Sequence, residues 1–151
     1  MKLHHTIIAS LIVVVVFVFV SIGALGQSGV PIAKFKTETA FWAGNAKMPA
    51  GTYSIFQSSA GDVGAIIFLR NEAGTHEAFL DVAAITSMSS HQAGDVVFDK
   101  LGTTEFFSAF YLPPPNSGPT MGYQALENNY EKALEKSAKK TQHSLPSTKP
   151  K

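Results

Sequence analysis

The sequence of 151 residues contains no cysteine. This absence excludes disulfides, cysteine-based metal sites, a thiol nucleophile and a lipid-modified cysteine at an export junction. Small secreted domains of eukaryotes often depend on disulfides for stability, so a chain of this size without them is more typical of a bacterial envelope protein. The length suits one domain and leaves no room for two good cores.

Net charge is nearly absent as well. The 12 lysines and arginines are balanced by 11 aspartates and glutamates, and the first 26 residues contribute only Lys2, which leaves 11 basic against 11 acidic residues. A chain without net charge has no general electrostatic attraction to nucleic acid or acidic lipid. Arg70 is the single arginine, whereas a nucleic-acid surface interleaves basic with aromatic residues. No nucleic-acid partner is therefore expected.

The N-terminus carries one long apolar run. A short, positively charged lead precedes residues 6–24, which are almost wholly apolar, and Ala24 and Gly26 are small residues at the −3 and −1 positions of a cleavage site. This layout predicts a secretory signal peptide over residues 1–26. The alternative is a retained membrane anchor, because about 20 apolar residues span a bilayer. Both interpretations export the domain, to the periplasm or outside the cell, with membrane contact only if the segment is retained.

The rest of the chain is organised around a turn pattern that occurs three times. Each copy ends in Gly-Thr, has Pro, Asn or Asp in its first two positions, and has an apolar run on both sides. These residues favour type I turns, and a Gly after such a turn adopts the left-handed conformation of a common hairpin connection. The copies are Met48-Pro49-Ala50-Gly51-Thr52, Asn71-Glu72-Ala73-Gly74-Thr75 and Asp99-Lys100-Leu101-Gly102-Thr103.

Alternating apolar and polar residues predict six strands that pair in three hairpins across these turns. We therefore expect residues 27–122 to form a mainly β domain, a six-stranded antiparallel small barrel or sandwich. The predicted strands cover residues 32–43, 53–56, 63–70, 76–85, 95–100 and 105–112. The predicted loops cover residues 58–62, 86–94 and 113–122.

Several strands indicate which face is buried. The predicted outward residues are Glu77, Phe79 and Asp81 in one strand and Asp95, Val97 and Asp99 in the next. The predicted core residues opposite them are Ala78, Leu80, Val82, Val96 and Phe98. Two other strands are apolar on both faces, and in the last of them Phe106 and Phe110 are expected opposite Phe107 and Tyr111. A strand with two apolar faces needs two covers.

A C-terminal amphipathic helix over residues 123–140 is predicted to supply the second cover. Acidic residues lead this segment and lysines close it, which matches the helix dipole. The helix is expected to pack on the sheet through two tyrosines and two leucines at helical spacing. These residues are Tyr123, Leu126, Tyr130 and Leu134. Residues 141–151 are predicted to form a disordered tail.

No catalytic, cofactor-binding or metal-binding residue is predicted. The histidines beyond the signal segment, His76, His91 and His143, show neither H-x-x-x-H nor H-E-x-x-H spacing, so nothing local sets up a metal site. The sequence has no G-x-S-x-G motif for a nucleophilic serine. Glu77 and Asp81 are interpreted as a solvated strand face rather than as a catalytic carboxylate pair.

Five aromatic residues could line a surface of the kind that binds carbohydrate or nucleobases. They are Trp42, Phe56, Phe79, Phe107 and Tyr111. Aromatic side chains on strands more often pack in the core or across strands, and this interpretation is favoured. No ligand surface is assigned from the sequence.

Two motifs resemble a small, exported, β-rich family of soil bacteria. The first is Phe41-Trp42-Ala43-Gly44 followed by Met48-Pro49-Ala50-Gly51-Thr52-Tyr53, and the second runs from Val96 to Gly102 and on through Phe106-Phe107-Ser108. A short closing element, Glu131-Lys132-Ala133-Leu134, is also similar, so the likeness covers residues 35–136. The resemblance implies a signal peptide and a hairpin-based fold. Its motifs are turn and core residues, and no catalytic residue carries over.

The sequence favours an exported bacterial envelope protein that acts as a non-enzymatic binding or structural module. Two alternatives stay open. One is an enzyme whose site assembles from the loops at residues 58–62, 86–94 and 113–122, and the other is a membrane-tethered periplasmic domain that retains residues 1–26. No cofactor is expected. An envelope protein or a second copy of the chain could be the partner.

Overall fold

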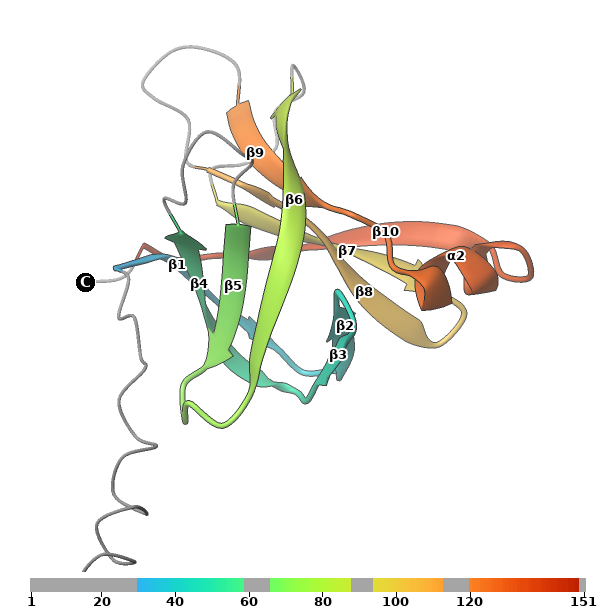
Figure 1. Ribbon diagram of the computed structural model, residues 1–151, viewed down its shortest axis with the longest axis horizontal. Helices are drawn as coiled ribbons and strands as arrows, with labels where there is room; N and C mark the ends of the chain where they lie inside the picture. The colour runs from blue at the N-terminus through green and yellow to red at the C-terminus, as the bar shows by residue number, and fades with distance from the viewer. Residues whose placement is uncertain (1–29, 59–65, 88–93, 113–119, 150–151) are drawn as a thin grey trace, which may run out of the picture.

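A computed structural model of the chain describes residues 30–58, 66–87, 94–112 and 120–149. The predicted signal segment and most of the three predicted loops lie outside these residues. The described residues form ten strands and one short helix (Figure 1). In chain order the elements are β1 Pro31–Thr37, β2 Phe41–Ala43, β3 Ala46–Met48, β4 Gly51–Ser58, β5 Ile66–Asn71, β6 Glu77–Ser87, β7 Asp95–Leu101, β8 Thr104–Tyr111, β9 Thr120–Ala125, α2 Asn129–Glu135 and β10 Lys140–Pro146. In this part of the chain, no helix has the length and apolar character needed to cross a membrane.

The strands form one open mixed sheet. Neighbouring strands follow the order β1-β4-β5-β6-β9-β8-β2-β3, and β7 pairs with both β8 and β10. The pairing of β2 with β8 is parallel, and the other ladders between described strands are antiparallel. The predicted mainly β class is confirmed. The predicted count of six strands is too low, and the closed-barrel alternative is wrong.

A single bridge joins β1, at one end of the sheet, to the segment that follows β10. The backbone N–H of Lys34 in β1 donates to the carbonyl of Thr148 at 2.9 Å, and the N–H of Thr148 donates to the carbonyl of Lys34 at 2.8 Å. An isolated bridge is not a ladder of paired residues, so this contact does not close the sheet into a barrel.

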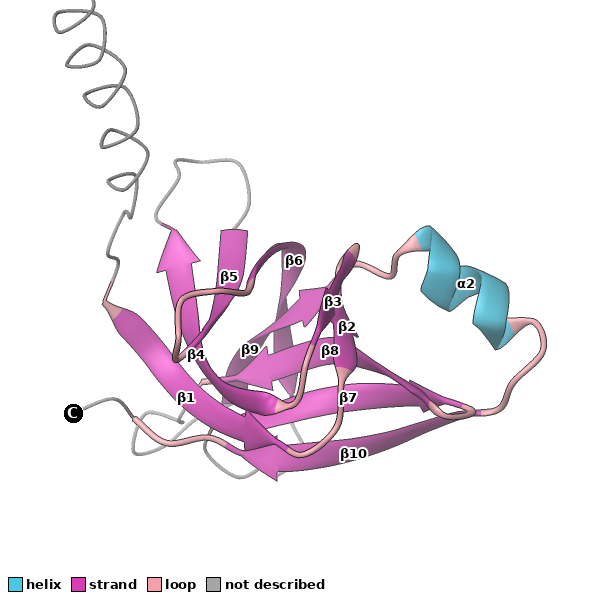
Figure 2. Cartoon of the chain, turned by 90° about the horizontal axis from the view of Figure 1, so that it is seen from below, coloured by secondary structure: helices cyan, strands magenta, loops and turns pink. Residues whose placement is uncertain are grey.

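Strand β6 belongs to both arms of the sheet. Its residues 77–81 pair with β5, and its residues 82–87 pair with β9. The sheet therefore turns at β6, and its two arms face each other across a shared core, as the layers of a β-sandwich do (Figure 1, Figure 2). The large core side chains are Phe35, Phe41, Met48, Tyr53, Ile55, Ile67, Leu69, Leu80, Val96, Phe98, Phe107 and Phe110.

The first of the three predicted turns is a connector, because an unpredicted hairpin precedes it. Strands β2 and β3 pair tightly around Gly44 and Asn45, and residues 48–52 then lead into β4. The predicted pairing of the first strand with residues 53–56 is still made, by β1 and β4. The Tyr53 side chain is fully buried and its hydroxyl donates to the Pro49 carbonyl at 2.6 Å. This hydrogen bond gives the buried hydroxyl of Tyr53 its partner.

The second and third turns do connect hairpins as predicted. In the second, the N–H of Gly74 donates to the carbonyl of Asn71 at 2.9 Å and Gly74 has a φ of 70°. In the third, Leu101 pairs with Thr104, so the connection is only two residues long. The φ of 64° at Gly102, the first of these two residues, is typical of a type II′ turn rather than a type I turn.

The predicted faces are confirmed in β6 and only in part in β7. Ala78 and Leu80 are buried, whereas Phe79 is 68% exposed. In β7 the core side chain Phe98 is buried as predicted, but Asp99, expected in solvent, is only 4% exposed. The reason is that β10 pairs along β7 and brings Lys140 against the Asp99 carboxylate.

A β-bulge changes the faces of β8. Val97 pairs with Ala109 but Phe98 pairs with Phe107, so Ser108 is an extra residue on the β8 side. The bulge shifts the alternation by one residue, and both Phe107 and Phe110 therefore reach the core. The prediction that these two rings lie on opposite faces is wrong for this reason.

The predicted C-terminal helix is much shorter than expected. Helix α2 spans only Asn129–Glu135, because residues 120–125 form β9 between β6 and β8. Tyr123 consequently lies in a strand, opposite Phe110, and Leu126 is 61% exposed. Tyr130 does pack on the sheet as predicted. Its ring centroid lies 5.2 Å from that of Trp42 and 5.8 Å from that of Phe106.

The predicted disordered tail contains a strand. Residues 140–146 form β10, which pairs with the whole of β7 in antiparallel register. The ring of His143 stacks on that of Phe98, with centroids 5.6 Å apart, and Leu145 packs against the core. The free edge of β7 supplies hydrogen-bonding partners that composition alone does not reveal.

Removal of β10 tests this corrected assignment. We expect a chain that ends at Lys139 to lose about 2 kcal/mol or more of unfolding free energy, because β7 loses a seven-residue partner and Phe98 loses the ring that covers it. Urea unfolding measures the difference. A chain that ends at Lys149 retains β10 and serves as the control. Equal stability of the two shortened chains would show that the segment behaves as a tail.

Candidate functional site

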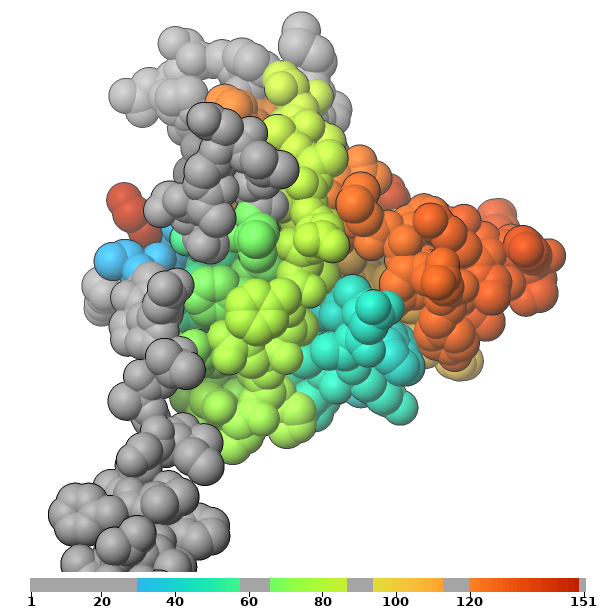
Figure 3. Space-filling model, viewed as in Figure 1, coloured from blue at the N-terminus to red at the C-terminus, as the bar shows by residue number. Residues whose placement is uncertain are grey.

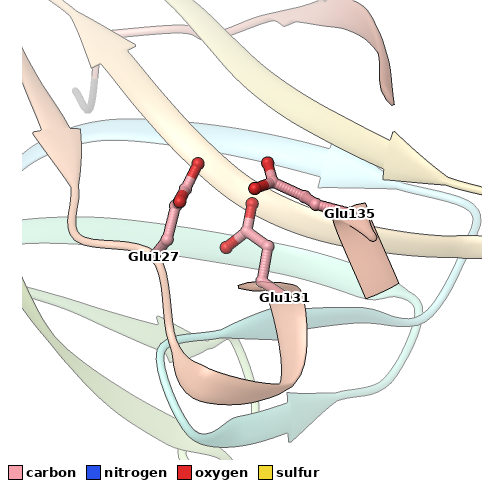
Figure 4. Close-up of side chains that lie close together, drawn as sticks. All are labelled: Glu127, Glu131 and Glu135. Carbon is pink, nitrogen blue, oxygen red and sulfur yellow. The ribbon is translucent and has the colours of Figure 1, made fainter. Parts of the chain in front are cut away.

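Lys140 brings four carboxylates together beside α2. Its ammonium Nζ lies 2.8 Å from Glu127 Oε1, 3.2 Å from Asp99 Oδ2 and 3.9 Å from Glu131 Oε1, and it also pairs with Glu135. The three glutamates are spaced four residues apart and point toward one another (Figure 4). We call these five residues the Lys140 cluster.

The helix start places the central glutamate of the Lys140 cluster. Asn128 is the N-cap residue, and its side-chain Oδ1 accepts the N–H of Glu131 at 2.7 Å. The Asn128 Nδ2 donates to the carbonyl of Gly44, so the same side chain also fastens the helix to the β2–β3 turn.

Burial dominates the electrostatics of the cluster. Glu131 is only 5% exposed, and burial raises its pKa to about 7; Lys140 opposes the rise, while Asp99, Glu127 and Glu135 add to it. Burial lowers the pKa of Lys140, but hydrogen bonds to Glu127, Glu135 and Asp99 outweigh that effect and hold it above its ordinary value. The cluster therefore carries an excess of negative charge around one ammonium group.

The chemistry of the Lys140 cluster is that of an ion-pair network. Carboxylate oxygens of Glu127, Glu131 and Glu135 lie within 4.8 Å of one another, and such oxygens suit hard cations. The Lys140 ammonium already provides the positive charge at this point. We therefore assign the cluster a structural role, in which it joins β10, α2 and β7.

An open depression lies next to this cluster. It has a volume of about 230 Å³ and is formed where β6, the β2–β3 turn and the segment leading into α2 meet (Figure 3). Its lining residues are Gly44, Asn45, Phe79, Leu80, Asp81, Leu126, Glu127, Asn128 and Asn129. We call it the Phe79 depression. A second open depression of about 460 Å³ shares Leu126 and Glu127 with it and extends along β9 to Lys132.

Phe79, one of the residues that line the depression, is the exposed end of a row of rings. Phe56, Phe68 and Phe79 occupy paired positions on β4, β5 and β6. The first two rings stack at 4.6 Å with an interplanar angle of 3°, and the third lies 5.7 Å from Phe68. The Arg70 guanidinium lies 5.5 Å and 5.7 Å from the centroids of Phe56 and Phe68. Phe79 is therefore supported from one side and open to solvent on the other.

The polar side of the depression comes from three separate segments. Asn45, Asp81 and Asn129 are exposed, and none of their side chains forms a hydrogen bond or ion pair with another residue of the described ranges. By contrast, Glu127 is bound to Lys140 and Asn128 to Gly44. The depression thus combines an exposed ring with amide and carboxylate groups that are available to a ligand.

The histidines considered from the sequence lie away from this depression. His76 Nδ1 is 3.0 Å from Thr75 Oγ1 in the second turn. His143 lies in β10, with its Nε2 4.0 Å from Glu105 Oε2, and this buried carboxylate also accepts the hydroxyl of Thr39 at 2.5 Å. His91 lies outside the described residues.

The remaining sequence candidates have separate positions. Glu77 pairs with Arg70 at 3.0 Å, whereas Asp81 lines the Phe79 depression. Of the aromatic candidates, Phe107 packs in the core, and Phe79 packs across strands against Phe68 while it stays 68% exposed. The sequence signal for the depression was Phe79 itself, an aromatic residue on a strand face that is otherwise acidic.

The chain was compared with protein-family models, curated proteins and solved structures, and no match was found in any of the three. The site is therefore interpreted from its own geometry.

The buried Glu131 predicts a pH dependence of stability. A pKa raised from 4.5 to about 7 means that the folded state holds this proton more tightly than the unfolded state, so the contribution is complete below pH 4.5 and is lost as the pH rises to about 7. The loss is of the order of 3 kcal/mol.

We expect Glu131→Gln to remove this dependence. The variant should match the unchanged chain near pH 4.5 and be more stable than it, by a few kcal/mol, near pH 8, because the neutral amide cannot ionise. Urea unfolding across this range measures the difference. Glu72→Gln makes the same chemical change at an exposed turn residue and should leave the pH profile as it is. If Glu131→Gln changed the unfolding free energy by the same amount at every pH, the pH dependence would not come from ionisation of Glu131.

Proposed function

We propose that this protein is exported to the bacterial envelope and acts there as a binding module, with the Phe79 depression as its binding face. Support for a binding role comes from an exposed aromatic ring beside polar side chains without described partners, which is a combination typical of ligand sites. Support for export comes from residues 1–26, whose charged lead, apolar run and small residues have the layout of a secretory signal.

Phe79 is the observation that carries the proposal. Its row partners Phe56 and Phe68 are 8% and 7% exposed, whereas Phe79 is 68% exposed. Apolar surface in water is unfavourable by roughly 25 cal/mol per Å², and a ligand that covers the ring recovers this free energy. The contact with Phe68 already orients the ring, so a ligand has little ordering cost to overcome.

Binding to envelope material tests the proposed face. The processed protein is mixed with an insoluble envelope preparation from the producing bacterium, and the sedimented fraction is measured. We expect Phe79→Ala to weaken the association at least about tenfold, since the central residue of a small site carries much of the binding free energy. Met121→Ala is the matched control, because Met121 is a 55% exposed apolar residue outside both depressions. The proposed binding face would be wrong if both variants lost association with the envelope material equally, or if neither variant lost it.

Export has its own test. Protein isolated from the envelope should have the intact mass of a chain that begins at Gln27, because the small residues Ala24 and Gly26 suit signal peptidase. A mass that includes residues 1–26 would instead support the membrane-tethered form. Recovery of the chain only from the cytoplasm would contradict both the processed exported form and the membrane-tethered form.

A further inference from the structure

We propose that the Phe79 depression binds a neutral, N-acetylated saccharide of the kind that forms glycan strands. This inference names the ligand class of the proposed binding face and rests on that proposed function. Three features of the depression carry it: the exposed ring, the composition of the polar groups and the distribution of charge.

The exposed ring suits the flat face of a sugar. A pyranose presents axial C–H groups on one face, which pack against an aromatic ring, while its hydroxyls point outward around the edge. Phe79 offers one open ring face, held in place by the ring of Phe68 at 5.7 Å. Leu126, which is 61% exposed and lines the same depression, adds an apolar contact of the size of an acetyl methyl group.

The polar groups around the ring suit hydroxyl and acetamido groups. Asn45 comes from the β2–β3 turn, Asp81 from β6 and Asn129 from the first position of α2, so they approach the depression from different sides. An amide both donates and accepts hydrogen bonds, and a carboxylate accepts O–H or N–H groups. A sugar hydroxyl needs both kinds of partner, and an acetamido group pairs with an amide in the same way.

The charge distribution argues against an anionic ligand. The depression contains carboxylates of Asp81 and Glu127 and no lysine or arginine among its lining residues. A phosphate- or carboxylate-bearing polymer would meet repulsion here. Lys140 is shared by Glu127 and three other carboxylates, so negative charge remains beside the depression, and a basic segment is the competing occupant that the experiment must distinguish from a sugar.

The neighbouring depression provides room for more than one sugar unit. It has about 460 Å³ and continues from Leu126 and Glu127 along β9 past Gln124. Gln124 supplies a further amide, while Lys132 lies at its far side. A linear oligosaccharide could therefore lie with one unit on Phe79 and the next over Leu126.

Titration with two sugars of equal length tests the proposal. The probes are tetra-N-acetylchitotetraose and cellotetraose, which differ in the acetamido groups, and binding is followed by calorimetry and by backbone amide NMR shifts of the processed protein. We expect the acetylated sugar to bind several-fold more tightly, with shifts at residues 44–45, 79–81 and 126–129. Binding should be independent of salt concentration, because the ligand is neutral.

Four variants locate the site. We expect Phe79→Ala to weaken binding at least about tenfold and Phe79→Trp to retain it, because the indole restores a stacking face. Asp81→Asn should weaken binding by about three- to tenfold through loss of a charge-assisted hydrogen bond. Met121→Ala should bind as the unchanged chain does. Phe79 and Asp81 are exposed, so the variants are expected to fold, and circular dichroism verifies this.

Failure of this inference can be separated from failure of the proposed function. If neither sugar binds, or if cellotetraose binds equally well, the ligand class is wrong, even where Phe79→Ala still releases the protein from envelope material. A salt-sensitive interaction with an oligolysine peptide would assign the face to a basic protein segment instead. A dimer in light scattering that Phe79→Ala converts to a monomer would assign it to a second copy of the chain. Either result overturns the saccharide proposal.

Discussion

The C-terminal part of the structure depends on the ion pairs of the Lys140 ammonium group. Strand β10 carries it, while the carboxylates around it come from β7, from the segment before α2 and from α2 itself. A helix of seven residues is not stable alone in water. The ion pairs to Lys140 and the contact of Tyr130 with the sheet therefore determine where α2 lies. Without the central cation, four acids at this spacing would repel one another.

The placement of α2 in turn shapes the candidate site. One wall of the Phe79 depression is strand β6, and the other two are the β2–β3 turn and the start of α2. The Asn128 side chain joins these last two walls, because it caps the helix and donates to the Gly44 carbonyl. The backbone segments that carry the lining residues are therefore fixed relative to each other, as a site built on braced elements requires.

The local sequence pattern was sufficient to predict turn positions and the buried face of a strand. The positions of the turns at Gly74 and Gly102 and the alternation in β6 were predictable, because each depends on residues close in the chain, although the type of the turn at Gly102 was not. Strands β9 and β10 could not be predicted in this way, because they form by pairing with the edges of other strands. Tyr123 in β9 also fits a helical pattern as well as a strand pattern. The candidate site could not be predicted from the sequence for the same reason. Its amides lie on segments that only folding brings together, and an outward Phe79 was the one local sign.

The bridge between Lys34 and Thr148 has a consequence for how the molecule is made. It joins the first described strand to nearly the last described residues, so a chain that emerges N-terminus first leaves the outer edge of β1 unpaired until almost all of it is available. An unpaired strand edge is a place where another unfinished chain can attach. The bridge to Thr148 covers only the middle of this edge, at Lys34, and it can form only once the C-terminal residues are available.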